Sequence, residues 1–445
     1  MSLPSARAVQ VQRVLPWMSP LDVAAGIADD DGALCLLSDP EVPGSRSFVA
    51  ADPDRVLVVD ISEGALFSPL RADDWLGGGV VGLASYDAGA RPATGSRPHV
   101  WPDLILARYQ AIAVFDHDVR RLTVTGWGET EADADAACDE AEVWIANAKQ
   151  PPLPGIPSPA LVPDAPAEAY IESVAEVVSR IAAGELFQAN IARGWSGNLN
   201  TNVDPFDVFI RLTQARGETA RTAPYGAFWR VGDRALVSNS PELFLACEAA
   251  TGRIETRPIK GTHARDPDPI KDAANAAELL ASGKDRAENL MIVDLMRNDL
   301  ARVCQPGSVV VERLFEVESH PTVHHLVSTI SGVLNPDVGP SGVLESTFPP
   351  GSITGAPKHQ AMKVIAALEP PRGAWCGSLF VVDPSGDLTA SVLIRTATFE
   401  KTAGRWTFRT HAGAGIVADS DPQAELRETD VKLSALRQAL TGKAI

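Results

Sequence analysis

The chain has 445 residues, of which 45% are hydrophobic and 22% are charged. This length is enough for one large domain, or two to three ordinary ones, with a sizeable core. Its formal net charge of -18 is offset by no local cluster of lysine and arginine, so the composition argues against nucleic acid or an anionic membrane as a partner. The amino-terminal residues contain no apolar run of signal-peptide length, and no segment approaches a membrane span, which predicts a cytoplasmic protein.

The first third of the chain predicts short strands separated by turns and then one helix. Apolar runs at 33–37, 56–59 and 104–124 are typical of strands, and the last is interrupted by an Asp-His-Asp turn. Three glycines at 77–79 predict a tight turn rather than a phosphate loop, because no helix with Lys and Ser/Thr follows. Residues 130–149 have the apolar spacing of a helix.

A proline-rich segment then divides the chain. Residues 150–166 contain seven prolines in seventeen positions and little periodicity, which predicts a linker or surface crossing. We therefore expect an amino-terminal region at 1–150, a linker at 151–166 and a catalytic region at 167–445.

The catalytic region alternates predicted helices and strands. Helices are expected at 167–183, 205–216, 357–368 and from 422 onward, with a longer helical pattern at 270–301 that is broken near Ser282. Strands are expected at 186–195, 308–315, 324–333, 379–382, 391–399 and 406–410.

The segment Pro241–Thr262 joins two strand-like runs through a turn signal at 249–252. A hairpin there brings Glu242 and Lys260 into one neighbourhood. A lysine acts as a nucleophile only when it is neutral, which needs a low-dielectric pocket or a neighbouring cation. The spacing alone equally fits a solvated loop lysine.

Carboxylates recur at helical spacing in two places. Asp285 and Glu288 share one face of the long helix, and Glu425, Glu428 and Lys432 share one face of the last helix. Mg²⁺ prefers one or two protein oxygens together with ligand and water, so these faces are a candidate magnesium site. The competing interpretation of Glu428 and Lys432 is an ordinary surface ion pair.

Three further features are candidates for ligand contact. Small residues at 351–358 lead into a helix and predict free amides that seat an anion, and a glycine-rich turn at 412–416 permits close backbone approach. Arg395 falls on the apolar face of its predicted strand and needs an anionic partner, either an internal carboxylate or a ligand. His325 is either a structural histidine or a general acid or base.

Together these residues resemble the chorismate-utilising enzymes, which include the component I subunits of anthranilate and aminodeoxychorismate synthases and the isochorismate and salicylate synthases. The similarity is dense from about residue 167 to 440. It is carried by RPIKGT at Arg257, AENLMIVDLMRNDLARV at Ala287, HHLVSTISG at His324, PPGSITGAPK at Pro349, IRTA at Ile394 and AGAGIVADSDPQAELRETDVK at Ala412. The resemblance implies an α+β fold of two antiparallel sheets packed as a sandwich, with helices outside and the active site between the sheets.

Two positions of the resemblance imply which reaction is catalysed. Lys260 stands where enzymes resembling anthranilate synthase carry alanine, and the PIKGT form is typical of aminodeoxychorismate synthases. Gln188 stands where isochorismate and salicylate synthases carry a water-activating lysine. The resemblance therefore implies amination of chorismate to 4-amino-4-deoxychorismate, on the route to 4-aminobenzoate and folate.

The same resemblance implies residue roles. Lys260 would be the covalent nucleophile, Glu242 the general acid and base, and His325 a neighbour of the same ring edge. Mg²⁺ would be held by Glu288 and Glu428, with Glu425 and Asp285 nearby. The implied substrate contacts are Gln188, Thr262, Thr354, Gly355, Lys358, Arg395, Gly413, Gly415 and Lys432.

The ammonia source and two departures complete the expectations. None of the five cysteines stands in a Gly-x-Cys-x-Gly elbow, so ammonia is expected from a separate glutamine amidotransferase subunit or from solution. Val381 occupies a position where the family often has tyrosine. Residues 36–38 lack the glutamate of the family's LLES tryptophan site, so tryptophan inhibition is not expected. The alternatives are anthranilate synthase component I and a non-catalytic paralogue that binds chorismate or tryptophan.

Overall fold

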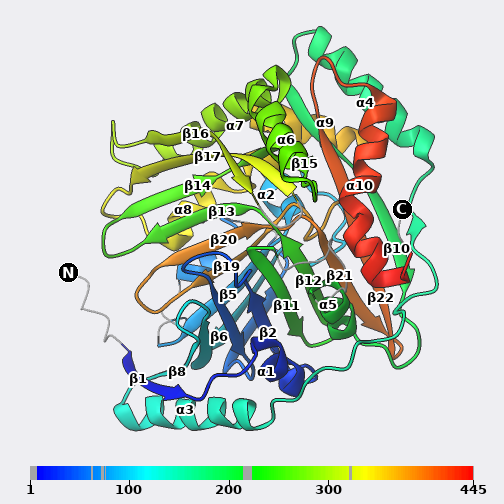
Figure 1. The fold of residues 1–445 in the computed structure, drawn as a ribbon. Coiled ribbons are helices and arrows are strands. Elements are labelled where there is room, and N and C mark those ends of the chain that lie inside the picture. The colour runs from blue at the N-terminus through cyan, green and yellow to red at the C-terminus, as the bar shows by residue number, and fades with distance from the viewer. Residues whose placement is uncertain are drawn as a thin grey trace.

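A computed structural model describes residues 8–61, 64–71, 75, 77–213, 223–319 and 323–443. Two antiparallel sheets pack against each other and helices cover the outside, which confirms the predicted α+β sandwich (Figure 1). Among the described residues, no helix has the length and apolar content needed to span a bilayer.

The larger sheet has 12 strands in the described residues. They are β1 (Val9–Leu15), β2 (Leu34–Leu37), β3 (Arg46–Ala50), β7 (Ala111–Asp116), β8 (Arg121–Gly128), β9 (Val162–Pro163), β10 (Gln188–Asn198), β11 (Tyr225–Val231), β12 (Arg234–Ser240), β18 (Gly355–Ala356), β21 (Thr396–Thr402) and β22 (Arg405–Ile416). Their order is β1-β8-β7-β3-β2-β11-β12-β21-β22-β10-β18, with β9 beside β10.

The smaller sheet has 10 strands in the described part of the chain. They are β4 (Arg55–Val59), β5 (Gly79–Ala84), β6 (Leu104–Tyr109), β13 (Leu243–Glu248), β14 (Arg253–Arg257), β15 (Ile259–Ala264), β16 (Val310–Ser319), β17 (Val323–Val333), β19 (Ser378–Val382) and β20 (Leu388–Val392). Their order is β15-β17-β14-β13-β20-β19-β5-β6-β4, with β16 beside β17. Both sheets combine strands from either side of residues 151–166.

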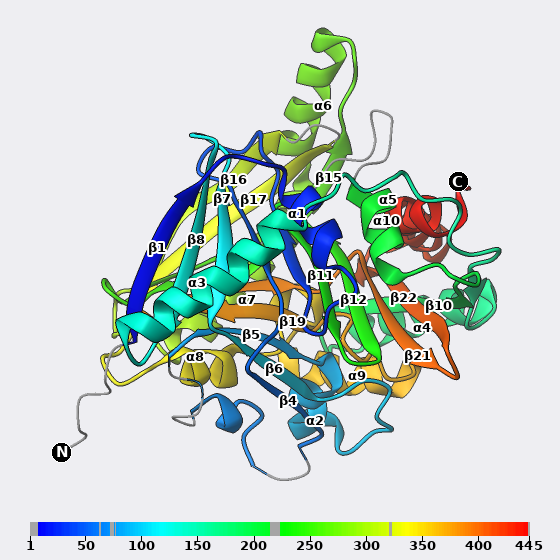
Figure 2. The same ribbon diagram turned by 90° about the horizontal axis from the view of Figure 1, so that it is seen from below.

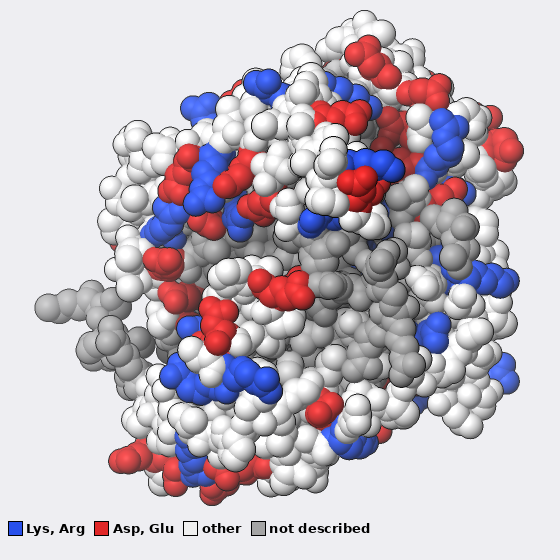
Figure 3. Space-filling view, in the orientation of Figure 1, with Lys and Arg blue, Asp and Glu red and all other residues white. Residues whose placement is uncertain are grey.

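The helices lie outside the sheets (Figures 1 and 2). They are α1 (Pro20–Ile27), α2 (Tyr86–Thr94), α3 (Glu131–Ala146), α4 (Ala167–Ala182), α5 (Pro205–Thr213), α6 (Pro269–Ala281), α7 (Gly283–Ala301), α8 (Pro340–Thr347), α9 (Lys358–Leu368) and α10 (Pro422–Thr441). In Figure 2, α6 projects from the body of the molecule. Figure 3 shows Lys and Arg side chains interspersed with Asp and Glu on one face.

Local capping explains why several predicted helix boundaries are correct. Thr130 and Asp133 form a capping box at the start of α3. Ser282 has an extended ψ of 112°, and its hydroxyl accepts a hydrogen bond from the Asp285 N–H, so it ends α6 and begins α7 at the predicted break.

The predicted strand 391–399 is wrong as a single element. The strand β20 ends at Val392 and β21 begins at Thr396, and between them Arg395 has a φ of +51° that a strand does not accommodate. Leu393 and Ala397 are both buried, so apolar alternation continues across the interruption and hides it.

Other differences concern elements and their ends. Elements without a counterpart in the prediction include the strands β1, β3, β11 and β12 and the helices α1, α2 and α8. The expected glycine turn at 412–416 is instead the end of β22. The predicted helix 205–216 is α5 up to Thr213, and its last three positions lie outside the described residues.

Between the sheets lies a cavity of about 740 Å³. Leu36, Leu37 and Ser38 line it from the larger sheet, and Val381 lines it from the smaller sheet. None of the predicted catalytic, substrate or metal residues lines this cavity, so the position where the family often has tyrosine belongs to a different region of the fold.

Candidate active site

Lys260 lies at a β-bulge in β15, which is the edge strand of the smaller sheet. The pairing of β15 with β17 shifts between Ile259 and Thr262, and Gly261 within the shift has a φ of +88°. A bulge of this kind turns a side chain out of the regular alternation. A Cβ at Gly261 would come within 3.0 Å of the Asp285 side chain on α7, so this glycine allows the strand to approach the helix closely.

Burial lowers the pKa of Lys260 from its ordinary value of 10.5. Glu288, Glu242 and Glu428 attract the ammonium and oppose this effect, whereas Lys432 repels it and adds to it. The hypothesis of a solvated loop lysine is therefore wrong, and Lys260 has the environment that a nucleophilic amine needs.

Glu242 lies directly between β12 and β13, and its side chain is buried. Burial raises the pKa of its carboxyl group to about 7, against the hydrogen bond from Ser352 and the attraction of Lys260, Lys432 and Arg395. A carboxyl group that titrates near neutral pH can both donate and accept a proton there. Ser352 is not among the predicted site residues, although it stands within the PPGSITGAPK string.

Carboxylates from both α7 and α10 lie close enough to Lys260 to attract its ammonium, namely Glu288 and Glu428. Burial, followed by repulsion from Asp285 and Glu428, raises the pKa of Glu288, although Lys260 and Lys284 oppose it. Burial and repulsion from Glu428 likewise raise the pKa of Glu425. Burial also acts on Glu428, but Lys432, at 2.6 Å, and the lysines 260 and 284 outweigh it and lower its pKa.

This donor set fits a hard divalent cation, because carboxylates that destabilise one another's charge are stabilised by a shared positive ion. Among the described residues, Asp60, His99 and Asp103 form a group of three whose ligand atoms all lie within 4.8 Å of one another, and no three carboxylates of α7 and α10 do. At Asp103, Arg91 donates to both carboxylate oxygens at 2.9 and 2.7 Å and already supplies the positive charge.

The strands β10 and β22 form the wall opposite Lys260. Gln188 is buried, and neither atom of its amide has a hydrogen-bond partner among the described residues. A Cβ at Gly415 would lie 2.2 Å from Gln188 Nε2 and 3.4 Å from Lys260 Nζ, so this glycine leaves the space in which the two side chains meet. Lys432 donates to the Gly413 carbonyl at 3.1 Å. An unpaired buried amide near a lysine with a lowered pKa indicates room for a polar ligand.

His325 and Thr262 are cross-strand partners on β17 and β15, and His325 Nδ1 lies 2.9 Å from the Thr262 hydroxyl. Arg395 is half-buried, and desolvation lowers its pKa while the attraction of Glu242 opposes this. Its place beside Glu242 thus comes from the connection between β20 and β21 rather than from strand alternation.

Two predicted substrate contacts have other partners in this structure. Lys358 is paired with Asp299 at 2.5 Å and also donates to the carbonyls of Thr347 and Pro349. The Thr354 hydroxyl donates to carbonyls of its own turn, those of Pro350 and Gly351. Gly355 has a φ of +139° and contacts the backbone of Gln188, so its role here is close packing of β18 on β10.

Comparison with known proteins identifies the family of the chain. The sequence profile of a family described as chorismate binding enzyme matches residues 51–438. Aminodeoxychorismate synthase component 1 of Escherichia coli strain K12 is 38% identical and covers 89% of this chain and 84% of its own length. Anthranilate synthase component 1 of Thermus thermophilus is 35% identical and covers 82% of this chain and 77% of its own.

Solved structures show the same fold. Anthranilate synthase component I of Streptococcus pneumoniae TIGR4 superposes with a TM-score of 0.74 at 26% identity, covering 89% of this chain and 93% of its own. The menaquinone-specific isochorismate synthase of Escherichia coli superposes with a TM-score of 0.75 at 20% identity, covering 98% of this chain and 95% of its own.

Proposed function

Because the chain belongs to the chorismate-binding enzyme family, we propose that it aminates chorismate with ammonia to give 4-amino-4-deoxychorismate. The observation that carries this proposal is the half-buried Lys260, whose pKa is lowered and whose ammonium is attracted by both Glu242 and Glu288. In members of the family that resemble anthranilate synthase, this position has no amine.

In the proposed reaction Lys260 and Glu242 work in two steps. The neutral Lys260 amine adds to C2 of chorismate, both double bonds of the ring diene shift, and the C4–O bond breaks as Glu242 protonates the departing hydroxyl to water. Ammonia then adds at C4, both double bonds shift back, and the C2–N bond breaks to return Lys260. Glu242, now a carboxylate, accepts the proton that the attacking ammonia loses. A pKa of about 7 suits both roles.

The remaining residues hold the substrate in this scheme. Arg395 and the backbone at Gly413 and Gly415 take the enolpyruvyl carboxylate, and His325 lies at the ring edge. The unpaired Gln188 amide has no basic group with which to activate water, which supports amination over hydration.

We propose that Glu288 and Glu428 hold Mg²⁺, with Glu425 and Asp285 nearby. The bound ion would neutralise the ring carboxylate and draw electron density from the diene. The raised pKa values of Glu288 and Glu425 support this assignment, since burial disfavours their charge by more than the neighbouring lysines restore, and a bound cation would stabilise the charged forms.

We propose that ammonia comes from a separate glutamine amidotransferase subunit, and that the protein acts in the cytoplasm on the route to 4-aminobenzoate and folate. The support is that three relatives at 37–39% identity are named component 1, which implies a further component.

The test is mass-spectrometric product analysis of the purified chain with chorismate, Mg²⁺ and ammonium. We expect aminodeoxychorismate from the wild type and at least about 100-fold less from Lys260→Ala, since losing a covalent nucleophile costs several kcal/mol of transition-state stabilisation. Lys363→Ala, at an exposed position of α9, is the matched control and should match the wild type. Isochorismate from the wild type would contradict the proposal.

A second candidate is anthranilate synthase component I, which the Thermus thermophilus relative favours. The same assay distinguishes the two, because anthranilate has lost the enolpyruvyl group and aminodeoxychorismate retains it. The non-catalytic alternative finds no support in the site, where the amine, the acid and the carboxylates are all present.

A further inference from the structure

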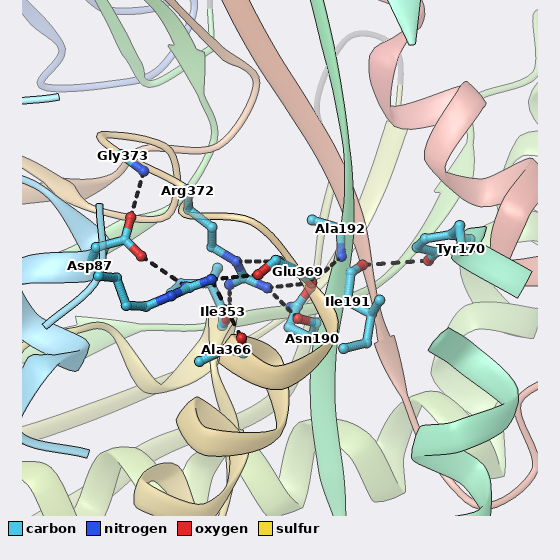
Figure 4. Close-up of polar contacts among 11 residues, drawn as sticks. Asp87, Tyr170, Asn190, Ile191, Ala192, Ile353, Ala366, Glu369, Arg372 and Gly373 are labelled. Atoms are coloured by element: carbon cyan, nitrogen blue, oxygen red, sulfur yellow. Dashed lines mark hydrogen bonds and ion pairs between the residues drawn. The ribbon is translucent and has the colours of Figure 1, made fainter. Parts of the chain in front are cut away.

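The strand β10 pairs with β22 on one edge, and on its other edge a short stretch of backbone has no neighbouring strand. The strand β18 pairs with Gln188 and Ala189, and β9 pairs only from Trp195 onward. Side chains complete the edge between them: Glu369 accepts a hydrogen bond from the Ala192 N–H at 2.6 Å, and Arg372 donates to the Asn190 carbonyl at 2.5 Å. An ion pair thus takes the place of a neighbouring strand (Figure 4).

The same guanidinium reaches a second element. Arg372 also donates to the Ile353 carbonyl at 3.3 Å, in the turn whose Thr354 carbonyl accepts from the Asn190 N–H at 2.8 Å. Ser352, the hydrogen-bond donor to Glu242, is the residue before Ile353. Arg372 therefore connects the strand that carries Gln188 to the turn that supports Glu242.

The ion pair is held rigidly. The Arg372 and Glu369 side chains are only 1% and 5% exposed and meet at 2.9 and 3.0 Å. The guanidinium lies 4.6 Å from the Tyr86 ring and 5.2 Å from the Trp375 ring. Figure 4 shows Arg372 directed at Glu369, Asn190 and Ile353 together. This planar, multidentate geometry is one that arginine satisfies and lysine does not.

We propose that Glu369 and Arg372 are a positioning pair, which sets the spacing between β10 and the turn 351–355 and thereby the placement of Gln188 and Glu242. Neither residue needs to touch the substrate. The inference rests on the proposed function, because it assigns Glu242 and Gln188 to the reacting site. A displacement of about 1 Å in a reacting group can cost about 100-fold in rate, so a loosened pair should slow the chemical step.

The test compares Arg372→Lys with Arg230→Lys. Arg230 is a close match: it is buried, donates to the Ala28 carbonyl at 2.8 Å, pairs with Asp204 at 2.6 Å and lies 5.5 Å from the Trp406 ring. It belongs to β11 and contacts none of the site residues named above. Both substitutions remove a buried guanidinium group, but only the guanidinium of Arg372 is hydrogen-bonded to β10 and the turn 351–355.

Both variants are assayed under conditions in which circular dichroism shows them fully folded. We expect Arg372→Lys to have a kcat about 10- to 100-fold lower than that of Arg230→Lys, while its KM for chorismate changes by less than about threefold. Equal kcat values in the two variants would overturn the inference and leave a purely stabilising pair. If Arg372→Lys does not fold, Glu369→Gln replaces it in the test, because glutamine keeps an oxygen for the Ala192 N–H. Glu369→Gln should also lower kcat, and a kcat equal to that of the wild type would overturn the inference. An inactive wild type would instead sink the proposed function, and this inference with it.

Discussion

Glu242→Gln should make the protein more stable at alkaline pH while abolishing most of its activity. The carboxyl group is buried, and its pKa is raised from an ordinary value of 4.5 to about 7. Glutamine has nearly the same shape, carries no charge at any pH, and keeps an oxygen that accepts the Ser352 hydrogen bond.

The direction of the pH dependence of stability follows from the pH at which the unfolded and the native protein each lose the Glu242 proton. The unfolded chain releases it near pH 4.5, whereas the native protein retains it until about pH 7, so wild-type stability is fully present below pH 4.5 and falls as the pH rises through 7. A pKa difference of this size between the two states corresponds to about 3 kcal/mol of stability, of which about 2 to 3 kcal/mol is lost between pH 5 and pH 8. The stability of Glu242→Gln lacks this dependence.

Urea denaturation at pH 5 and pH 8 measures the difference, with Glu140→Gln on the exposed face of α3 as the control. The stability of Glu242→Gln relative to the wild type should rise by about 2 to 3 kcal/mol from pH 5 to pH 8, and that of the control should not change. Turnover should fall by about 100- to 10,000-fold, because the amide cannot transfer a proton. A stability difference that is the same at both pH values would refute the assignment of a buried, protonated carboxyl group.

Three further outcomes follow from the site. Gly415→Ala should lower turnover by at least about tenfold, because its methyl group would overlap the buried Gln188 amide; wild-type kinetics would show that the amide can move aside. Chelation of divalent cations should abolish turnover and Mg²⁺ should restore it, and Glu288→Gln should raise the Mg²⁺ concentration for half-maximal activity by at least about tenfold in a titration. Lys358→Met should destabilise the fold by about 3 to 5 kcal/mol in urea, since it leaves the Asp299 carboxylate buried and unpaired; a loss of chorismate affinity without loss of stability would instead favour direct substrate contact.

Much of the fold was predictable where local interactions specify it. The break at Ser282 and the start of α3 at Thr130 follow from side-chain caps within a few residues of each helix end. The hairpin of β13 and β14 follows from its own turn signal. The strands β11 and β12 were not predicted, although they pair with each other across the turn at 232–233; their outer partners, β2 and β21, are distant in the sequence.

The site shows the same division between local and distant causes. Helical spacing correctly grouped Asp285 with Glu288 and Glu425 with Glu428, since three residues place side chains on one face. Alternation misplaced Arg395, because a left-handed residue between two strands leaves the apolar pattern uninterrupted. Lys358 looked like an anion-binding lysine, and only the fold brings Asp299 to it.

The sequence by itself determined the residue types of the site, their grouping on helix faces, and the family resemblance through its ordered strings. Only the tertiary structure decided whether Lys260 is solvated or buried, because the groups that desolvate and charge its surroundings come from α7, α10 and β22. Likewise only the folded edge of β10 showed that Glu369 and Arg372 replace a missing strand. Burial and charge coupling depend on which distant segments meet, and no local pattern in the chain records that.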